Sequence, residues 1–256
     1  MKAVILAAGV GKRLSTVTNG RPKCLCRVAG HTLLSRYLED LAHLGFSQVV
    51  IVVGYQHHLV RTAAESQAFP GEIRFVFNDA YERGSIGSLW AARHECNDHL
   101  VMMDADVLYH PIILRRLVES PHPNALLMDE TIAQTSEECM VVIQQERVIA
   151  LTKQVPPAYD QIGEGVGFLK VHARETPHLL ASVEGCIQRG KFDMEYEDAL
   201  TDFFQAVPVG VERIGGLPWV EIDFPEDLRK AEKEIIPLLP SLRTEVSLGL
   251  PTLSPF

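Results

Sequence analysis

The chain has 256 residues, of which 46% are hydrophobic and 22% are charged, as in an ordinary globular protein that can bury a full core. A formal net charge of −9 argues against nucleic-acid binding, which needs a basic surface. No apolar run approaches the roughly 20 residues that span a bilayer. Met1-Lys2 leads directly into a predicted strand, and the five cysteines are scattered. We therefore expect no signal peptide and a cytoplasmic protein with reduced thiols.

The first predicted element is a short buried strand, Val4 to Leu6, that opens into a glycine-rich turn. Small residues in that turn let the backbone approach a ligand, and Gly9 and Gly11 permit positive φ. Cations follow at Lys12, Arg13, Arg21 and Lys23. Free backbone N–H groups and positive side chains that converge after a strand are typical of a phosphate-binding site.

Two common phosphate motifs do not fit this stretch. A Walker loop ending at Lys12 needs glycine at the position of Leu6, and a dinucleotide fingerprint needs a third glycine at the position of Leu14. An ordinary strand–loop junction with surface cations remains the alternative on the glycine pattern alone.

The order L-A-A-G-x-G-x-R-L, followed after a loop by P-K, resembles the opening of the nucleotidyltransferases that make nucleotide-activated sugars and alcohols. The resemblance implies the nucleotide-diphospho-sugar transferase type of fold. It also implies that the turn holds the nucleotide, that Arg13 contacts the triphosphate and that Lys23 lies at the reacting phosphate. The nucleotide-binding residues of this stretch would be Leu6, Ala7, Ala8, Gly9, Gly11, Arg13 and Lys23.

The next elements alternate between strand and helix. After an extended piece at Cys24 to Val28, the spacing predicts a helix from Thr32 that ends at Gly45. The pattern then predicts a strand over 48–53, a helix over 56–65 and a strand over 73–77. Such alternation predicts an α/β fold, with a Rossmann-like mixed, mainly parallel sheet covered by helices on both faces. Ligands bind beyond the carboxyl ends of strands in such sheets.

The segment Asn78 to Trp90 follows the third strand and leads into a helix ending near Glu95, with Ser85 or Ser88 as its cap. A plain loop and helix start would explain it. In cytidylyl-transferring members of the resembled family, a similar segment contacts the base, which implies base-reading roles for Gly87 and Ser88.

The strand predicted over 99–103 runs into Asp104 and Asp106. Alternation places both carboxylates on one face, where they would repel each other unless a cation lies nearby. Carboxylates and substrate phosphates are the ligands that Mg²⁺ takes. The resemblance makes Asp106 the metal ligand and places Asp104 next to it without direct contact to the metal. The alternative is that both aspartates are solvated at the start of a loop.

The second half of the chain is predicted to bind the acceptor. We expect a helix at 114–118, strands at 125–128 and 165–171, and a hairpin of 140–143 with 148–151. Lys153 follows the hairpin, and the resemblance implies that it touches the acceptor phosphate. A solvated lysine is the alternative reading.

The same half contains acidic residues that we expect near the acceptor, at Glu137, Glu138, Asp193, Glu195 and Glu197. Residues 193–198 are predicted to form the first turn of a helix, where acidic residues also suit the helix dipole. A strand over 216–224 would place Glu221 and Asp223 on one face, and the resemblance makes Asp223 the second metal ligand. The residues predicted to bind the acceptor are Lys153, Glu138, Glu164, Glu195, Tyr196 and Glu197.

A final helix is predicted from Pro225 to about Ile236. We therefore expect one domain over 1–236, with a nucleotide-binding half at 1–110 and an acceptor-binding half at 111–236. The proline-broken tail, 237–256, would strap the surface or contact a second copy of the chain in a homodimer.

The resemblance, closest to phosphocholine and aminoalkylphosphonate cytidylyltransferases, implies a Mg²⁺-dependent enzyme. It would join CTP to a small phosphate or phosphonate and release pyrophosphate. Phosphocholine enzymes carry a tryptophan near the position of Cys139, and acidic residues in place of aromatic ones suit a primary amine. Phosphocholine and 2-aminoethylphosphonate are both candidate acceptors. The alternatives are a sugar-1-phosphate or inositol-1-phosphate nucleotidyltransferase and a catalytically silent nucleotide-binding protein. No membrane or nucleic-acid partner is expected.

Overall fold

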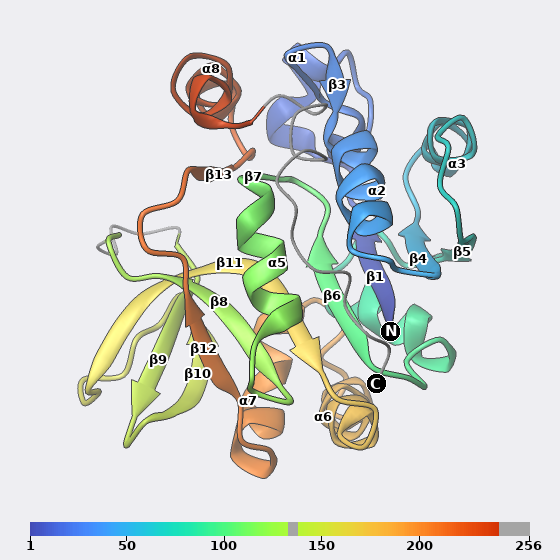
Figure 1. Ribbon diagram of the computed structural model, residues 1–256. Coiled ribbons are helices and arrows are strands. Elements are labelled where there is room, and N and C mark those ends of the chain that lie inside the picture. The colour runs from blue at the N-terminus through green and yellow to red at the C-terminus, as the bar shows by residue number, and fades with distance from the viewer. Residues whose placement is uncertain (133–137, 241–256) are drawn as a thin grey trace.

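A computed structural model describes residues 1–132 and 138–240, and within them one large sheet carries the fold (Figure 1). Its strand order is β10-β9-β11-β6-β1-β4-β5, and β8 pairs with both β11 and β12. Two smaller sheets pair β13 with β7 and β2 with β3. The strands are β1 Lys2–Ala7, β2 Arg27–Val28, β3 His31–Thr32, β4 Gln48–Val53, β5 Glu72–Phe77, β6 Leu100–Asp104, β7 Val107–Tyr109, β8 Ala125–Asp129, β9 Met140–Gln144, β10 Arg147–Thr152, β11 Gln161–Val171, β12 Gly210–Arg213 and β13 Trp219–Glu221.

The first half of the chain forms the parallel part of the sheet. β1 lies between β4 and β6 and is parallel to both, and β5 is parallel to β4. The long strand β11 joins antiparallel to β6, β8 and β9. The predicted mixed sheet is therefore confirmed, and its antiparallel strands come from the second half of the chain.

Helices cover both faces of the sheet, because neighbouring residues of a buried strand face opposite sides. Ile5 and Met103 pack in a core with α2, α3 and α5. Met102, next to Met103, packs in a second core with α4, α6 and α7. The helices are α1 Ser15–Thr18, α2 Leu33–His43, α3 His57–Glu65, α4 Ile86–Ala91, α5 Pro111–Glu119, α6 Thr176–Gln188, α7 Tyr196–Ala206 and α8 Pro225–Lys230.

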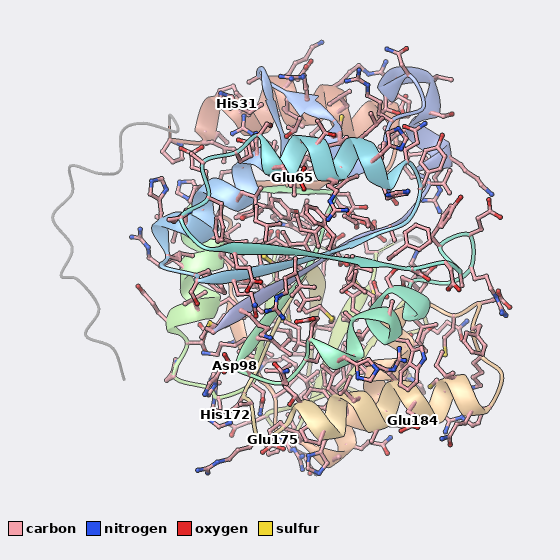
Figure 2. The ribbon with its side chains drawn as sticks, turned by 90° about the vertical axis from the view of Figure 1, so that its right-hand side faces the viewer. His31, Glu65, Asp98, His172, Glu175 and Glu184 are labelled. Atoms are coloured by element: carbon pink, nitrogen blue, oxygen red, sulfur yellow. The ribbon has the colours of Figure 1, made fainter. Side chains whose placement is uncertain are left out.

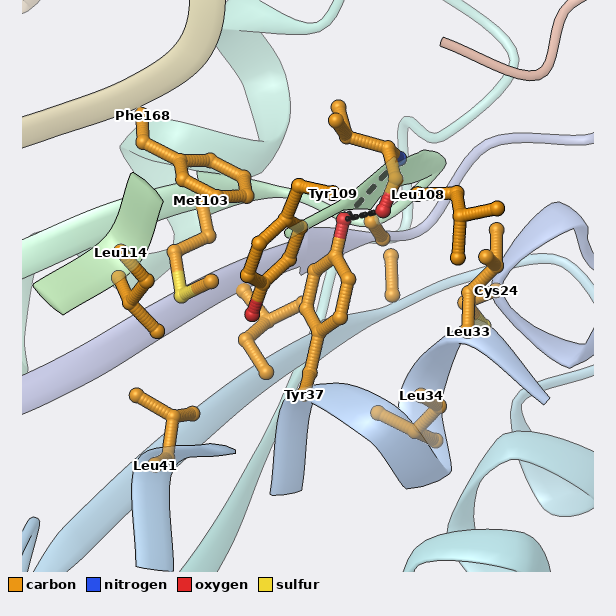
Figure 3. Packing of buried hydrophobic residues seen from close by; sticks show 14 of the residues in the cluster. Cys24, Leu33, Leu34, Tyr37, Leu41, Met103, Leu108, Tyr109, Leu114 and Phe168 are labelled. Atoms are coloured by element: carbon orange, nitrogen blue, oxygen red, sulfur yellow. Dashed lines mark hydrogen bonds between the residues drawn. The ribbon is translucent and has the colours of Figure 1, made fainter. Parts of the chain in front are cut away.

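The first core contains a tyrosine that holds the chain directly after Asp106 (Figure 3). The hydroxyl of Tyr37, on α2, donates a hydrogen bond to the Val107 carbonyl oxygen at 2.7 Å and accepts one from the Val107 amide at 3.0 Å. Its ring lies 5.3 Å from that of Tyr109 and 6.0 Å from that of Phe168. The amide and the carbonyl of the buried residue Val107 thus both have hydrogen-bond partners, and these bonds connect α2 to β7.

The structure corrects several predicted boundaries. Residues 23–25 form a 3-10 turn, so the piece predicted to be extended at 24–28 keeps only β2. The strand predicted over 216–224 is only β13, because it pairs with the three-residue strand β7. The helix predicted within 193–198 begins at Tyr196. The helix predicted to end near Glu95 is α4 followed by a 3-10 turn, and the one from Pro225 ends as a π-turn and a 3-10 turn.

The carboxyl ends of β1 and β6 lie at the upper end of the molecule in Figure 1. Figure 2 shows the adjacent face, on which Glu175 and Glu184 lie along α6 and Asp98 and His172 lie at the lower end. Among the described residues, every helix is too short or too polar to cross a bilayer. Two of the predicted features lie outside the described residues. They are Glu137, which is expected near the acceptor, and residues 241–256 of the tail, which is expected to strap the surface or contact a second copy of the chain.

Candidate active site

Lys23 is the point at which three distant segments meet. Its Nζ donates a hydrogen bond to Asp106 Oδ2 at 2.9 Å and another to Asp223 Oδ1. Asp106 follows β6, and Asp223 follows β13. β13 pairs antiparallel with β7, and the Ile222 amide donates a further hydrogen bond of 2.9 Å to the Asp106 carbonyl oxygen. These contacts hold the two aspartates side by side.

The electrostatics of this contact favour a charged lysine. Burial lowers the pKa of Lys23, but Asp106 and Asp223 raise it by more, and the pKa ends above its ordinary value. The site therefore presents a permanent cation beside two carboxylates.

The glycine turn is shaped around the same lysine. Gly11 has a φ of +63°, and a Cβ at this position would lie 2.7 Å from Lys23 Cγ, so both its conformation and its surroundings require glycine. A Cβ at Gly9, by contrast, would meet no atom within 4 Å. Arg13 follows the turn; its Nη1 lies 2.9 Å from Asp223 Oδ2, and its guanidinium lies 5.0 Å from the centre of the Phe224 ring.

The strand that leads into the turn is fixed on both sides. Leu6 is paired with Asp104 on one side and Val52 on the other. Ala7 and Ala8 are buried, and the Ala8 carbonyl accepts a 3.0 Å hydrogen bond from the Tyr55 amide. The turn thus begins from a rigid strand end, which is what a phosphate cradle requires.

Glu221 is a third carboxylate beside the predicted metal ligands. One oxygen each from Asp106, Glu221 and Asp223 lie within 4.8 Å of one another. Three carboxylate oxygens are hard ligands of the kind that Mg²⁺ takes, and the Lys23 ammonium contacts two of these carboxylates. Desolvation, followed by the charges of Asp106 and Asp223, raises the pKa of Glu221 to about 8. Glu221 alternates with Asp223 in the sequence, but this pattern alone does not indicate a role for Glu221.

Asp104 lies behind this group and is held by the acceptor half. Tyr196, the first residue of α7, donates a 2.8 Å hydrogen bond from its hydroxyl to Asp104 Oδ2. Gly167 of β11 packs against the same carboxylate, since a Cβ there would lie 2.4 Å from Oδ2. Burial, and then the charges of Glu197 and Asp106, raise the pKa of Asp104 well above its ordinary value. Asp104 therefore links the group of Asp106, Glu221 and Asp223 to α7.

Glu197, the next residue of α7, has an unusual carboxylate. Its Oε2 is buried and has no hydrogen-bond partner within the described residues. Burial, and then the charges of Glu195, Asp198 and Asp106, raise the pKa of Glu197 to about 7, although a bond to its own backbone opposes the shift. A buried oxygen without a partner is costly unless a ligand satisfies it.

The residues predicted to read the base lie at the start of α4. Gly87 and Ser88 are buried, and Asn78 donates a 3.1 Å hydrogen bond from Nδ2 to Ser88 Oγ. The Asn78 Oδ1 accepts from the Ala80 amide at 2.9 Å. Sequence reasoning missed Asn78, because an asparagine after a strand is common in loops. Ser85 occupies the N-cap position but makes no capping bond to α4.

The remaining residues predicted to bind the acceptor fall into two places. The charges of Lys153 and Glu195 act on Asp198 of α7, and Glu195 Oε2 accepts a 3.3 Å hydrogen bond from the Ser85 amide. Glu138 and Glu164 lie together with Asp129 in a separate group, where burial and these two neighbouring charges raise the pKa of Glu164 to about 7. The structure therefore brings Lys153, Glu195, Tyr196 and Glu197 to one end of α7, and it places Glu138 and Glu164 around β11.

The chain is similar to several known proteins. A family model described as the MobA-like NTP transferase domain matches residues 3–147. The chain is 29% identical over 250 residues to the CMP-5'-(3-aminopropyl)phosphonate synthase of Streptomyces rubellomurinus, covering 93% of this chain and 39% of that protein. It is 30% identical over 237 residues to the bifunctional IPC transferase and DIPP synthase of Rubrobacter xylanophilus, covering 91% of this chain and 52% of that protein. The chain thus spans about half the length of these relatives, or less.

A solved structure gives the same fold. The CTP:phosphocholine cytidylyltransferase of Streptococcus pneumoniae matches with a TM-score of 0.73 and 26% sequence identity, covering 90% of this chain and 97% of that chain. The predicted nucleotide-diphospho-sugar transferase type of fold is confirmed.

Proposed function

Because the chain belongs to the MobA-like NTP transferase family, a family of nucleotidyltransferases, we propose that it is a cytidylyltransferase. It joins CTP to a small phosphate or phosphonate acceptor and releases pyrophosphate. We further propose that the acceptor carries a primary amine, as in 2-aminoethylphosphonate, and that the reaction depends on Mg²⁺ and takes place in the cytoplasm.

The observation that carries the reaction type is the shared contact of Lys23 with Asp106 and Asp223. A glycine turn and Arg13 lie on one side of this contact, and carboxylates suited to a metal lie on the other. Phosphoryl-group chemistry needs cations around the reacting phosphate more than it needs a proton acceptor. A structural protein has no use for such a group of residues.

The chemistry follows from these groups. An acceptor oxygen forms a bond to the α-phosphorus of CTP, and the bond between that phosphorus and the bridging oxygen breaks, so that pyrophosphate leaves with the electron pair. No general base is required, because a phosphomonoester with a second pKa of about 6 is already a dianion near neutral pH. Lys23 and Arg13 would hold the phosphates and offset their charge. Asp106 and Asp223, with Glu221 beside them, would hold Mg²⁺, which supplies further charge neutralisation.

The acceptor proposal rests on Glu197. Its buried, unpartnered Oε2 would be satisfied by an ammonium group that donates hydrogen bonds. A trimethylammonium group has no N–H to donate, so phosphocholine would leave the oxygen without a bond. A neutral sugar hydroxyl would donate a hydrogen bond to this oxygen but would not neutralise the Glu197 carboxylate.

The relatives support a small phosphate or phosphonate acceptor and do not decide whether its amine is primary or quaternary. One of them is named for an aminopropylphosphonate product and another for phosphocholine. A third is named as a bifunctional IPC transferase and DIPP synthase, so the acceptor has to be decided by experiment.

The test is pyrophosphate release over a matrix of four triphosphates against 2-aminoethylphosphonate, phosphocholine, inositol 1-phosphate and hexose 1-phosphates. We expect CTP with an amine-bearing acceptor to exceed every sugar phosphate by about tenfold or more in kcat/KM, since carboxylates left desolvated and unpaired carry a penalty. A higher kcat/KM with a hexose or inositol phosphate would overturn the acceptor proposal.

A matched pair of variants tests the role of Glu197. Glu197→Gln keeps the shape and removes the charge, so the KM for the amine-bearing acceptor should rise about tenfold while the KM for CTP changes less than about twofold. Glu184→Gln is the control, because Glu184 is an exposed residue of α6 (Figure 2) and accepts a 3.3 Å hydrogen bond from Gln188 of the same helix. An unchanged acceptor KM in Glu197→Gln would exclude a contact with the amine.

A further inference from the structure

We propose that the base-reading loop and the start of α7 form one unit, through which nucleotide binding orders the acceptor site. The contacts between residues 83–86 and 192–196, called here the loop–helix junction, form this unit. Arg83 and Ser85 act in it as positioning residues. The inference rests on the proposed function, because it takes Gly87 and Ser88 as nucleotide contacts and Glu197 as an acceptor contact.

The junction is built from backbone pairs as well as side chains. The Gly84 amide donates a 3.2 Å hydrogen bond to the Phe192 carbonyl, and the Ile86 amide donates one of 3.4 Å to the Met194 carbonyl. The two segments are more than 100 residues apart in the chain. These two bonds join the turn that precedes α4 to the turn that precedes α7.

Gly84 shows how closely the two segments approach. A Cβ at this position would lie 2.0 Å from the Met194 carbonyl oxygen and 2.6 Å from the Asp193 carbonyl carbon. Both of these are backbone atoms, which cannot move aside without moving the whole segment. A displacement of the base-reading loop must therefore displace the start of α7.

Side chains on each side of Gly84 add directional contacts. Arg83 binds Asp193 through two hydrogen bonds, of 2.7 Å from Nε and 2.8 Å from Nη2, and its guanidinium lies 4.9 Å from the centre of the Phe192 ring. Ser85 Oγ accepts a 2.8 Å hydrogen bond from the Tyr196 amide. The Ser85 hydroxyl thus binds the first residue of α7 instead of capping its own helix.

Each side of the junction continues directly into a predicted binding residue. Two residues beyond Ile86, Ser88 accepts a hydrogen bond from the buried Asn78. On the other side, Tyr196 reaches Asp104, and Glu197 carries the unpartnered oxygen. A nucleotide that fixes Gly87 and Ser88 would therefore fix the direction of Glu197.

Because the Arg83–Asp193 ion pair lies at the surface, its removal should affect the position of α7 more than the folding stability. The side chains of Arg83 and Asp193 are 45% and 74% exposed, and exposed ion pairs contribute little to stability. Arg61 offers a matched control. It makes an exposed ion pair with Glu65 and lies 4.8 Å from the centre of the Phe75 ring, but it belongs to α3.

The test is amide hydrogen exchange with and without CTP and Mg²⁺, with no acceptor present. In the wild type and in Arg61→Ala, CTP should slow exchange about threefold or more both at 84–88 and at 192–198. In Arg83→Ala and Ser85→Ala, CTP should still protect 84–88, but the protection of 192–198 should be lost. Ser35→Ala is the control for Ser85, because Ser35 lies in the first turn of α2 and donates a 2.8 Å bond to the Thr32 carbonyl.

The outcomes separate the two proposals. Protection of 84–88 without protection of 192–198 in the wild type would overturn the junction, as would full protection of 192–198 in both variants. A lack of protection at 84–88 in every protein would instead show that the nucleotide does not contact this loop, which contradicts the proposed function. As a second readout, Ser85→Ala should raise the acceptor KM about fivefold with the CTP KM within about twofold.

Discussion

The ammonium group of Lys23 contacts two carboxylates, and we propose that its charge acts on the reacting phosphates. A charge in that position stabilises the transition state more than the bound nucleotide. We therefore expect Lys23→Ala to lower kcat about a hundredfold or more while the Kd for CTP rises less than about tenfold. Steady-state kinetics and calorimetry measure the two quantities. Lys233→Ala, at an exposed position, is the control, and a loss of CTP affinity equal to the loss of rate would refute this role for Lys23.

Glu164 supplies a pH-dependent contribution to stability. Burial and the charges of Glu138 and Asp129 raise its pKa from 4.5 to about 7, so the folded state binds this proton more tightly than the unfolded state does. The cost of ionising Glu164 is absent below about pH 4.5, grows as the pH rises and is complete above about pH 7.

Glu164→Gln imitates the protonated side chain and should remove this cost. The melting temperature of the variant should exceed that of the wild type by a few degrees at about pH 8, and the two should converge near pH 4.5. Thermal unfolding followed at several pH values measures the difference. A variant that is less stable than the wild type at about pH 8 would mean that the Glu164 carboxylate has a favourable partner.

At the scale of elements, α2 and β7 control where Asp106 points. The Tyr37 hydroxyl satisfies both the amide and the carbonyl of Val107, the residue after Asp106. Tyr37→Phe leaves both groups buried without partners, which should cost about 1–3 kcal/mol of unfolding free energy and lower kcat by misplacing Asp106. Denaturant unfolding and kinetics test this. Tyr159→Phe, on an exposed tyrosine, should change neither, and a stable Tyr37→Phe with full activity would contradict the prediction.

The elements that the sequence predicts best are those whose patterns are local. The strands over 48–53 and 73–77 and the helix from Thr32 follow from apolar spacing and caps, and they agree with β4, β5 and α2. The strand expected over 216–224 was too long, because its length depends on the short partner β7. The helix near 193 begins later than expected, because Asp193 and Glu195 bind Arg83 and Ser85 across the fold.

For the whole molecule, the difference between local patterns and contacts across the fold also explains which site residues could be predicted. The turn that carries Gly9 to Lys23 could be recognised because its chemistry is contiguous, and Asp106 could be placed because parallel strands end at one edge. Asp223 was assigned from the resemblance alone, and it follows β13, which pairs antiparallel with β7 outside the large sheet. Glu221 and Asn78 gain their positions only from contacts across the fold. The junction between 83–86 and 192–196 joins segments of both halves, and no periodicity within either segment indicates it.

The charge of the whole chain also bears on its stability. The net charge is −9, and three of the carboxylates, from Asp106, Glu221 and Asp223, gather at one point. Their repulsion is offset in part by Lys23 and Arg13. A divalent cation at this point should therefore stabilise the folded state, because it would bind the assembled carboxylates but not the unfolded chain.

The expected effect can be measured without any substrate. Mg²⁺ at about 100 times its Kd should add about 2.7 kcal/mol, which for a chain of this size raises the melting temperature by about 5–10 °C. Asp106→Asn should lose most of this rise and, in the presence of substrates, should reduce turnover about a hundredfold or more. Asp98→Asn, at the opposite end of the sheet (Figure 2), should keep the rise, and NaCl of equal ionic strength should not reproduce it. A full Mg²⁺-dependent rise in Asp106→Asn would place the cation at another site. Binding to the unfolded chain and general charge screening cannot explain a difference between Asp106→Asn and Asp98→Asn, because each variant removes one carboxylate.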